Sequence, residues 1–322
     1  MEFITKDITA AMLDQDPVDT QMGRANLVEY NTTEDTIVWL DRKGTTIQMV
    51  PPAPRGAPGE AIGDSDRDAV PFRLLSYPLT EHVSVDAVRG KRRFGTVNEM
   101  ETFQEKVNEK LAIGNARYDL TDEVQRVNML RGKQVDESGN VLRDFFDVFG
   151  LTPQTFNFAL DTDSTEIMAK VRQAVRLIQN DLNGRMARGF MCYLGSTAFD
   201  MLVTHKTYKE SKLATPQAAD LLTSVNQVKV GPVVFEEYTF RPNGQPLVDE
   251  HEMLLFPVGV QGMLLGRYGP ATWEIDQPAP RYAKQIADPK GTGVTIEMEA
   301  HSIHINTLPR CVVHGDARAN TP

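Results

Sequence analysis

The sequence predicts an α+β fold, with helices in the middle of the chain and strands on both sides of them. Apolar residues recur at three-to-four spacing over 96–130 and 163–184, as they do on one face of a helix. Beyond Val225, and most clearly over 294–306, apolar and polar residues alternate as in strands. At 322 residues, 41% of them hydrophobic, the chain is long enough for one large core or two smaller ones.

The first fifty residues are predicted to form an arm and a hairpin. Apolar and acidic positions mix up to Asp16-Pro17, where proline disfavours a helix, and this indicates an N-terminal arm. Two β-rich runs follow at 36–40 and 45–50. Gly44 between them can supply the positive φ of a tight turn, so the two runs are predicted to pair with each other.

Residues 51–95 lack the pattern of a packed segment. Proline and glycine are frequent, no helical period appears, and only short β-like pieces occur near 72–77 and 82–88. A stretch of this length without its own core is typical of a loop that projects to touch something, or of disorder.

Two long helices are predicted next. The first begins at Thr96, because Thr96-Val97-Asn98-Glu99 fits the capping box, and it ends at Gly132 with a possible break at 118–121. At 1.5 Å per residue it would reach about 50 Å, which is typical of a strut. Residues 144–150 are predicted to be an extended linker.

The second helix is predicted to open at Asp163 and to end near Gly184. Shorter helices are predicted at 196–202, where Ser196 would be the N-cap, and at 215–222 with a proline in the first turn. The remaining pieces are a turn at 242–244 and strands at 228–230, 233–238, 253–256 and 294–306.

Charge and cysteine content exclude several classes of function. The formal net charge of −10 opposes tight binding to phosphate backbones, since such binding depends on cationic side chains. Cys192 and Cys311 stand alone, which predicts buried reduced thiols and no four-ligand zinc site. No run of eighteen apolar residues and no basic leader is present, so we expect a cytoplasmic product.

No catalytic, cofactor or metal site is predicted. His301 and His304 lie in an alternating run, where a spacing of three places them on opposite faces of a strand. Cys311 and His314 have no second pair to complete a set of ligands. Ser196 lacks the second glycine of the nucleophile elbow.

One basic cluster stands out in this acidic chain, at Arg89-Gly90-Lys91-Arg92-Arg93. It can be a solvated loop. It can also dock on an acidic neighbour, where arginine–carboxylate contacts would fix the register. Arg89, Lys91, Arg92 and Arg93, together with Arg55 in the proline-rich stretch, are therefore the candidate inter-subunit contacts.

Several stretches, in order along the chain, resemble the phage lambda-type major capsid protein E family. They include Leu120-Thr121-Asp122-Glu123 with Arg126, Leu255-Phe256-Pro257-Val258-Gly259 and Tyr268-Gly269-Pro270-Ala271. The likeness spans nearly the whole chain. Further stretches are 50–59, 130–136, 139–141, 147–150, 282–284 and 301–310.

The resemblance implies the Hong Kong 97-type capsid fold, with an axial domain and a peripheral domain that carries a long spine helix. Under this interpretation the chain divides into an N-terminal arm with the first hairpin, an extended loop, the peripheral domain, the axial domain and C-terminal strands that return to the peripheral domain. The corresponding boundaries are 1–50, 51–95, 96–150, 151–270 and 271–322.

The resemblance also implies a function. The chain would be the major capsid protein of a tailed bacteriophage, building an icosahedral shell of hexamers and pentamers around double-stranded DNA. Scaffold, portal and possible decoration proteins would be its partners, DNA would be touched only non-specifically, and no cofactor or membrane would be needed. Alternatives are an encapsulin-like compartment shell and a soluble enzyme without a recognisable motif.

Overall fold

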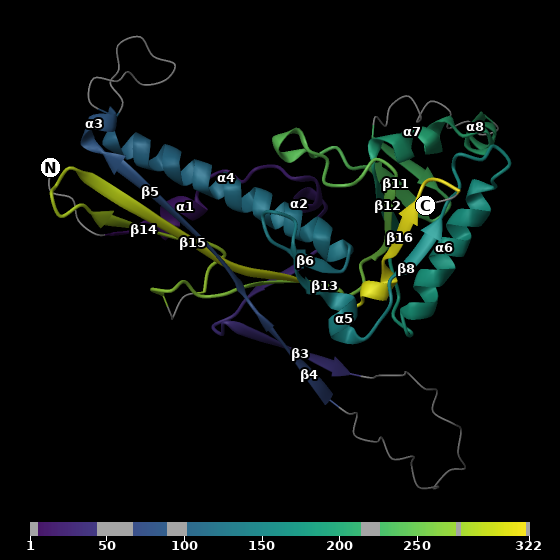
Figure 1. Cartoon of the computed structure of the whole chain (residues 1–322), viewed down its shortest axis with the longest axis horizontal. Helices are drawn as coiled ribbons and strands as arrows, with labels where there is room; N and C mark the ends of the chain where they lie inside the picture. Colours follow the sequence, from purple (N-terminus) through teal and green to yellow (C-terminus); the bar gives the residue numbers. More distant parts are fainter. Residues whose placement is uncertain (1–5, 44–66, 89–101, 214–225, 275–277, 320–322) are drawn as a thin grey trace, which may run out of the picture. The chain divides into compact units, whose positions relative to one another are not determined.

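The chain divides into two compact units in the computed structural model, which describes residues 6–43, 67–88, 102–213, 226–274 and 278–319 (Figure 1). The first unit takes the described residues of Met1–Val38, Phe72–Arg126 and Leu265–His304. The second takes those of Trp39–Pro71, Val127–Leu264 and Ile305–Pro322. The chain therefore passes from one unit to the other five times. The expected α+β class is confirmed, because each unit combines helices with strands.

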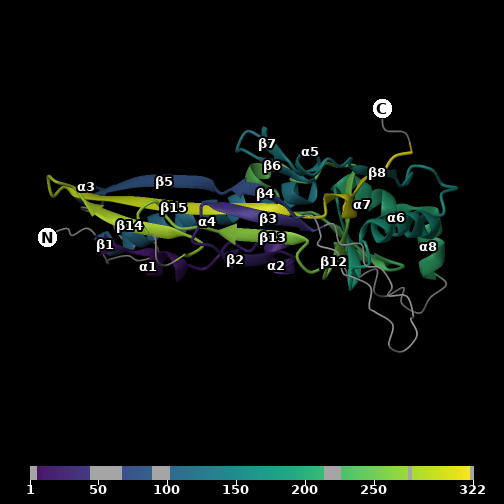
Figure 2. The same cartoon turned by 90° about the horizontal axis from the view of Figure 1, so that it is seen from below.

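A mixed sheet forms the framework of the first unit. Its long central strand, β15 (Gly293–Asn306), pairs in antiparallel fashion with β14 (Tyr282–Ala287) and with β5 (Leu75–Ser84). The strand order is β1-β14-β15-β13-β2, with β1 (Lys6–Asp7) and β2 (Glu29–Thr32) at the two ends and β13 (Leu264–Tyr268) between β15 and β2. Helices α1 (Thr9–Leu13), α2 (Gln21–Ala25), α3 (Val85–Val88) and most of α4 (Phe103–Leu130) complete the unit, as Figure 2 shows from below.

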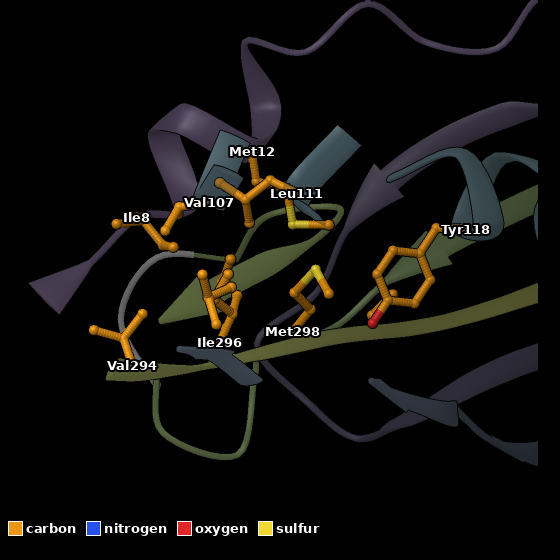
Figure 3. Packing of buried hydrophobic residues seen from close by; sticks show 11 residues of the cluster. Ile8, Met12, Val107, Leu111, Tyr118, Val294, Ile296 and Met298 are labelled. Carbon is orange, nitrogen blue, oxygen red and sulfur yellow. The ribbon is translucent and has the colours of Figure 1, made fainter. Parts of the chain in front are cut away.

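The core of the first unit lies between β15 and the helices. Alternate residues of β15 point into it, which explains the period of two in the sequence. Figure 3 shows Val294, Ile296 and Met298 facing Ile8 and Met12 and apolar residues of α4. Ile8 and Met12, at the start and inside of α1, therefore belong to this core, so this part of the predicted arm packs against the sheet of its own unit.

Helix α4 begins with a capping box, although not the one read from the sequence. The amide of Thr102 donates to Glu105 Oε2 at 2.9 Å, and the amide of Glu105 donates to Thr102 Oγ1 at 3.2 Å. The Thr96–Glu99 pattern lies outside the described residues. The helix then runs for 28 residues without a break at 118–121, and Gly132 follows with φ 73°.

The predicted hairpin pairs differently from the expectation. The first run is a strand, β3 (Ile37–Lys43), and its partner is β4 (Arg67–Arg73). The other run, 45–50, lies outside the described residues. The short pieces expected near 72–77 and 82–88 belong to β4 and to the ten-residue β5, except that Val85–Val88 is the short helix α3.

The second unit is built on a six-stranded sheet in the order β10-β11-β9-β12-β16-β8. Helix α6 (Ile167–Asp181) packs on β12 and β16, whereas α7 (Ser196–Thr204) packs on β11 and on α8 (Lys206–Leu213). The strands are β8 (Gln154–Asn157), β9 (Gly189–Leu194), β10 (Gln227–Val230), β11 (Val233–Glu237), β12 (Glu252–Val258) and β16 (Val313–Asp316).

Three local predictions for the second unit are wrong. Residues 145–149 form the helix α5 (Phe145–Phe149), because Asp144 accepts from the amide of Phe146 at 2.8 Å and Gly150 ends the turn at φ 63°. Helix α6 starts at Ile167, with Glu166 in place of Asp163 as its N-cap. Ser196 is the first residue of α7, whose N-cap is Gly195.

The remaining elements of the second unit are a hairpin and two single turns. The hairpin joins β6 (Lys133–Val135) to β7 (Val141–Asp144), and the 3₁₀ turns lie at Pro242–Gly244 and Pro309–Cys311. The predicted helix at 215–222 lies outside the described residues, and α8 is a helix that the sequence pattern did not indicate. Among the described residues, no helix combines the length and apolar content needed to cross a bilayer.

Candidate functional site

A network of buried charges lies along one side of α4 in the first unit. Asp119, Asp122 and Glu123 have at most 9% of their surface exposed. Arg281, from the segment before β14, donates through Nη2 to Asp119 Oδ1 at 2.5 Å and to Asp122 Oδ2 at 3.1 Å. It also donates to the carbonyl oxygen of Asn115 at 3.2 Å. One guanidinium thus neutralises two buried carboxylates and ties the helix to the sheet.

A second cation extends the network towards β2. Arg126 Nη1 lies 3.1 Å from Glu123 Oε2, and Arg126 Nε donates to the hydroxyl oxygen of Tyr30 at 2.6 Å. The guanidinium also lies over the Tyr30 ring, 5.4 Å from its centroid. The Tyr30 ring in turn stacks on Tyr268 at 5.1 Å. Burial raises the pKa of Tyr30 to about 12, so its hydroxyl keeps its proton.

His304 closes this part of the network as a neutral ring. Its burial, opposed by the charge of Asp122, lowers its pKa to about 4. The Tyr30 hydroxyl oxygen and His304 Nε2 share a hydrogen bond of 3.1 Å. Asp122 Oδ1 is 3.8 Å from the same nitrogen, but a neutral ring makes no ion pair with it.

The same carboxylates hold the N-terminal segment on the helix. The amide of Val18 donates to Asp119 Oδ2 at 2.7 Å, and the amide of Met22 donates to Glu123 Oε1 at 2.6 Å. Carboxylates four residues apart on α4 therefore accept from amides four residues apart in the segment. The network joins the N-terminal segment, α4, β2 and β15, and its charges are used in holding these elements together.

Two further ion pairs perform a similar task in the second unit. Arg131 forms a two-pronged contact with Glu252, through Nε to Oε1 at 2.8 Å and Nη2 to Oε2 at 2.5 Å. Arg310 Nε donates to Asp181 Oδ2 at 3.0 Å, which links the turn before β16 to the end of α6. The first pair links the residue that follows α4 to the start of β12.

The predicted contact residues Arg55, Arg89, Lys91, Arg92 and Arg93 all lie outside the described residues, so their docking role stays a prediction. Cys192 and Cys311 are buried free thiols, as predicted. Burial raises the pKa of Cys311 to about 12. In the described part of the chain, no group of three or more His, Cys, Asp or Glu is placed to hold a metal ion.

The sequence analysis did not single out Arg281, Asp119 or Tyr30. Asp122, Glu123 and Arg126 entered it only through the resemblance. One signal was present: carboxylates recur at 119, 122 and 123 beside the apolar stripe of α4. Their partners could not be read from it, because Arg281 lies 162 positions from Asp119 and 159 from Asp122.

Solved structures with this fold include phage capsids. The chain matches a subunit of the mature capsid of bacteriophage PhiM1 with a TM-score of 0.54 at 11% identity, covering 100% of this chain and 93% of that one. It matches the capsid of cyanophage P-SCSP1u with a TM-score of 0.56 at 9% identity, covering 96% and 90%. The fold is thus the Hong Kong 97 type of capsid fold.

Sequence comparison agrees with this class. The major capsid protein of Pseudomonas phage KPP10 is 24% identical over 312 residues, 89% of this chain and 88% of that protein. That of Salmonella phage Felix O1 is 25% identical over 159 residues, 48% of this chain and 43% of that protein. Residues 5–317 match the family of phage major capsid protein E, and the chain belongs to that family.

Proposed function

We propose that this major capsid protein builds the icosahedral head of a tailed bacteriophage, assembling into hexamers and pentamers that enclose packaged double-stranded DNA. The observation that carries the proposal is the family match, which extends over residues 5–317. An encapsulin-like compartment or an enzyme is a weaker candidate, because the matched family is one of phage shell proteins.

The two units suit the two domains that such a subunit needs. We assign the peripheral domain to the first unit, because α4 is a 28-residue helix of the kind expected for the spine. We assign the axial domain, which gathers around the capsomer axes, to the second unit with its six-stranded sheet. Within the expected loop at 51–95, Leu75–Ser84 pairs with β15 in the first unit. We propose that the part before it forms the extended loop that lies over a neighbouring subunit.

Partners follow from the same proposal. Subunits would fold in the host cytoplasm, assemble around a scaffold protein with a portal at one vertex, and then exchange one set of contacts for another as the shell matures. A decoration protein would be an optional addition. DNA would be enclosed without being gripped, in keeping with the net charge of −10.

Electron microscopy of the purified chain, produced alone and together with its scaffold protein, tests the proposal. We expect closed particles of uniform diameter in at least one of the two preparations. Monomers or small open oligomers in both preparations would contradict it. Shells that enclose a co-purifying enzyme in place of a scaffold or DNA would favour a compartment.

The basic cluster gives a second test. Reversing two charges, Arg92→Glu with Arg93→Glu, should reduce the yield of shells while the subunit stays folded, because like charges across an interface repel. Arg24→Glu with Lys290→Glu is the matched control, since it makes the same change in net charge at exposed positions. Normal shells from the Arg92/Arg93 variant would remove the docking role.

A further inference from the structure

The outward face of α6 carries two arginines that repel each other. Arg172 and Arg176 are one turn apart and exposed, and neither has an ion pair or hydrogen bond among the described residues. No carboxylate stands three or four positions from either of them. Like charges at this spacing destabilise a helix, so the pair is unfavourable for an isolated subunit.

The positive charge continues beyond the end of the helix. Arg185 and Arg188 are exposed in the turn that leads to β9 and form no ion pair within the described part of the chain. The one acid within α6, Asp181, is already bound to Arg310. The basic ridge, defined as Arg172, Arg176, Arg185 and Arg188, is thus a run of unpaired cations in a chain whose net charge is −10.

Negative charge gathers at the other end of the same helix. Asp163 and Glu166 lie just before α6, both are exposed, and neither has a cation partner among the described residues. The helix dipole accounts for acids at the start of a helix and for bases at its end. It does not account for Arg172 and Arg176, which lie in the interior of α6.

We propose that this helix is a contact between copies of the chain, in which the basic ridge of one copy receives the acidic step, Asp163 and Glu166, of the next. The two patches are different surfaces, so each subunit offers one to each neighbour. Such head-to-tail contacts close into rings when the rotation between subunits permits it. This inference rests on the proposed function, and it supplies a contact within the capsomer.

Charge complementarity favours a second copy over DNA as the partner. A surface that binds phosphates gains from cations along its whole length, and the acidic step at one end would repel the nucleic acid. A surface that is basic at one end and acidic at the other can pair with the same surface of a second copy. The arginines also suit a carboxylate partner, because their guanidinium groups can make two parallel hydrogen bonds to it.

A charge exchange tests the contact. Arg172→Glu with Arg176→Glu should lower the yield of shells at least about tenfold, because the α6 part of the ridge is then acidic, like the step that it meets. Asp163→Lys with Glu166→Lys should do the same with two basic surfaces. The four changes in one chain restore opposite charges between the α6 part of the ridge and the step, so this combined variant should again form shells. Lys229→Glu with Arg241→Glu, at exposed positions of the same unit, is the matched control for net charge.

The outcomes separate this inference from the proposed function. If the unchanged chain forms no shells with or without its scaffold, the proposed function fails, and the inference fails with it. If the unchanged chain assembles and both reversed variants assemble equally well, only the contact is wrong. A combined variant that stays unassembled while it retains the circular dichroism spectrum of the unchanged chain also overturns the contact.

DNA binding is measured in parallel on the same variants. If Arg172→Glu with Arg176→Glu leaves assembly unchanged but weakens binding to a duplex of about 30 base pairs, the ridge is a nucleic-acid surface and the inference is wrong. We expect no difference in DNA affinity beyond that of the Lys229/Arg241 control.

Discussion

Arg281 is the residue on which most of the buried charge of the first unit depends. Arg281→Leu would leave Asp119 and Asp122 without their cation in a buried setting. Removing one partner of a buried ion pair costs about 3–5 kcal/mol, so we expect a loss of this size in the free energy of unfolding. Urea denaturation followed by circular dichroism measures it.

The matched control is Arg24→Leu. Arg24 pairs with Asp19 at the surface, where both side chains are more than half exposed, and solvent screening leaves such pairs little effect on stability. Equal losses for Arg281→Leu and Arg24→Leu would show that the network on α4 is not the stabilising feature we describe.

His304 makes stability depend on pH. Its pKa is about 4 in the folded protein against an ordinary value of 6.5, so the unfolded chain takes up the proton first as the pH falls. The contribution is fully present above pH 6.5 and is lost progressively between pH 6.5 and 4. At about 1.4 kcal/mol per unit of pKa, the loss reaches about 3 kcal/mol.

His304→Gln separates this effect from the titration of other groups. Glutamine can still form a hydrogen bond with the Tyr30 hydroxyl, but it does not titrate. Unfolding free energies measured at a series of pH values should therefore fall less steeply in the variant below pH 6.5. Identical slopes for the two proteins would mean that His304 is not buried in its neutral form.

The sequence predicted the state of single residues where that state depends on the residue type alone. The buried thiols of Cys192 and Cys311 follow from the ordinary behaviour of isolated cysteines. The network around Arg281 was not predicted from the sequence. A buried charge is recognised only together with its partner, and here the partner comes from another part of the chain.

At the scale of elements, the residue that follows β9 lies very close to the backbone of the loop before β12. This close approach leaves room for glycine alone. A Cβ at Gly195 would collide with the backbone of Asp249 and Glu250, which has little freedom to move. Gly195→Ala should therefore lower the free energy of unfolding by about 1–3 kcal/mol.

Gly189, at the other end of the same strand, provides the comparison. A Cβ there meets no atom within 4 Å, so Gly189→Ala should be neutral or stabilise by up to about 1 kcal/mol. Thermal unfolding of the two variants measures the difference. If Gly195→Ala is as stable as Gly189→Ala, the backbone contact at Asp249 is not as close as described.

The elements with strong periodic patterns were predicted well and their ends were not. The stripes of α4 and α6 and the alternation of β15 each reflect one buried face, which the sequence displays directly. The ends of the helices depend on capping residues, and several residues near each end are able to act as the cap. The pattern at Thr96 resembles the capping box that Thr102 and Glu105 form, and Glu166 takes the place that Asp163 could have filled.

At the scale of the whole molecule, residues 51–94 offer a test of the extended loop. The part of this range before β5 is rich in proline and glycine and lacks an apolar period, which predicts a segment that is accessible until a neighbouring subunit covers it. Limited proteolysis of unassembled protein should cut there first, and assembled shells should be cut more slowly at the same sites. A first cut inside α6 would contradict the assignment.

The overall architecture was predictable only through the resemblance. Composition and periodicity gave an α+β chain with room for one core or two, but not the pairing of distant strands such as β5 with β15. Those pairings depend on contacts between residues that are far apart in sequence, and no local pattern specifies them. The fold was predicted from the stretches that resemble the capsid family in order along the chain, since the pattern of helices and strands did not specify it.

The five passages of the chain between the two units limit how this protein can change through recombination. Neither unit corresponds to one continuous stretch of the gene, so a single crossover cannot exchange one of them between related phages. An exchange inside the gene would join parts of each unit that did not evolve together. We therefore expect capsid genes of this kind to be inherited as a block, and their variation to accumulate by point mutation and by insertion in loops.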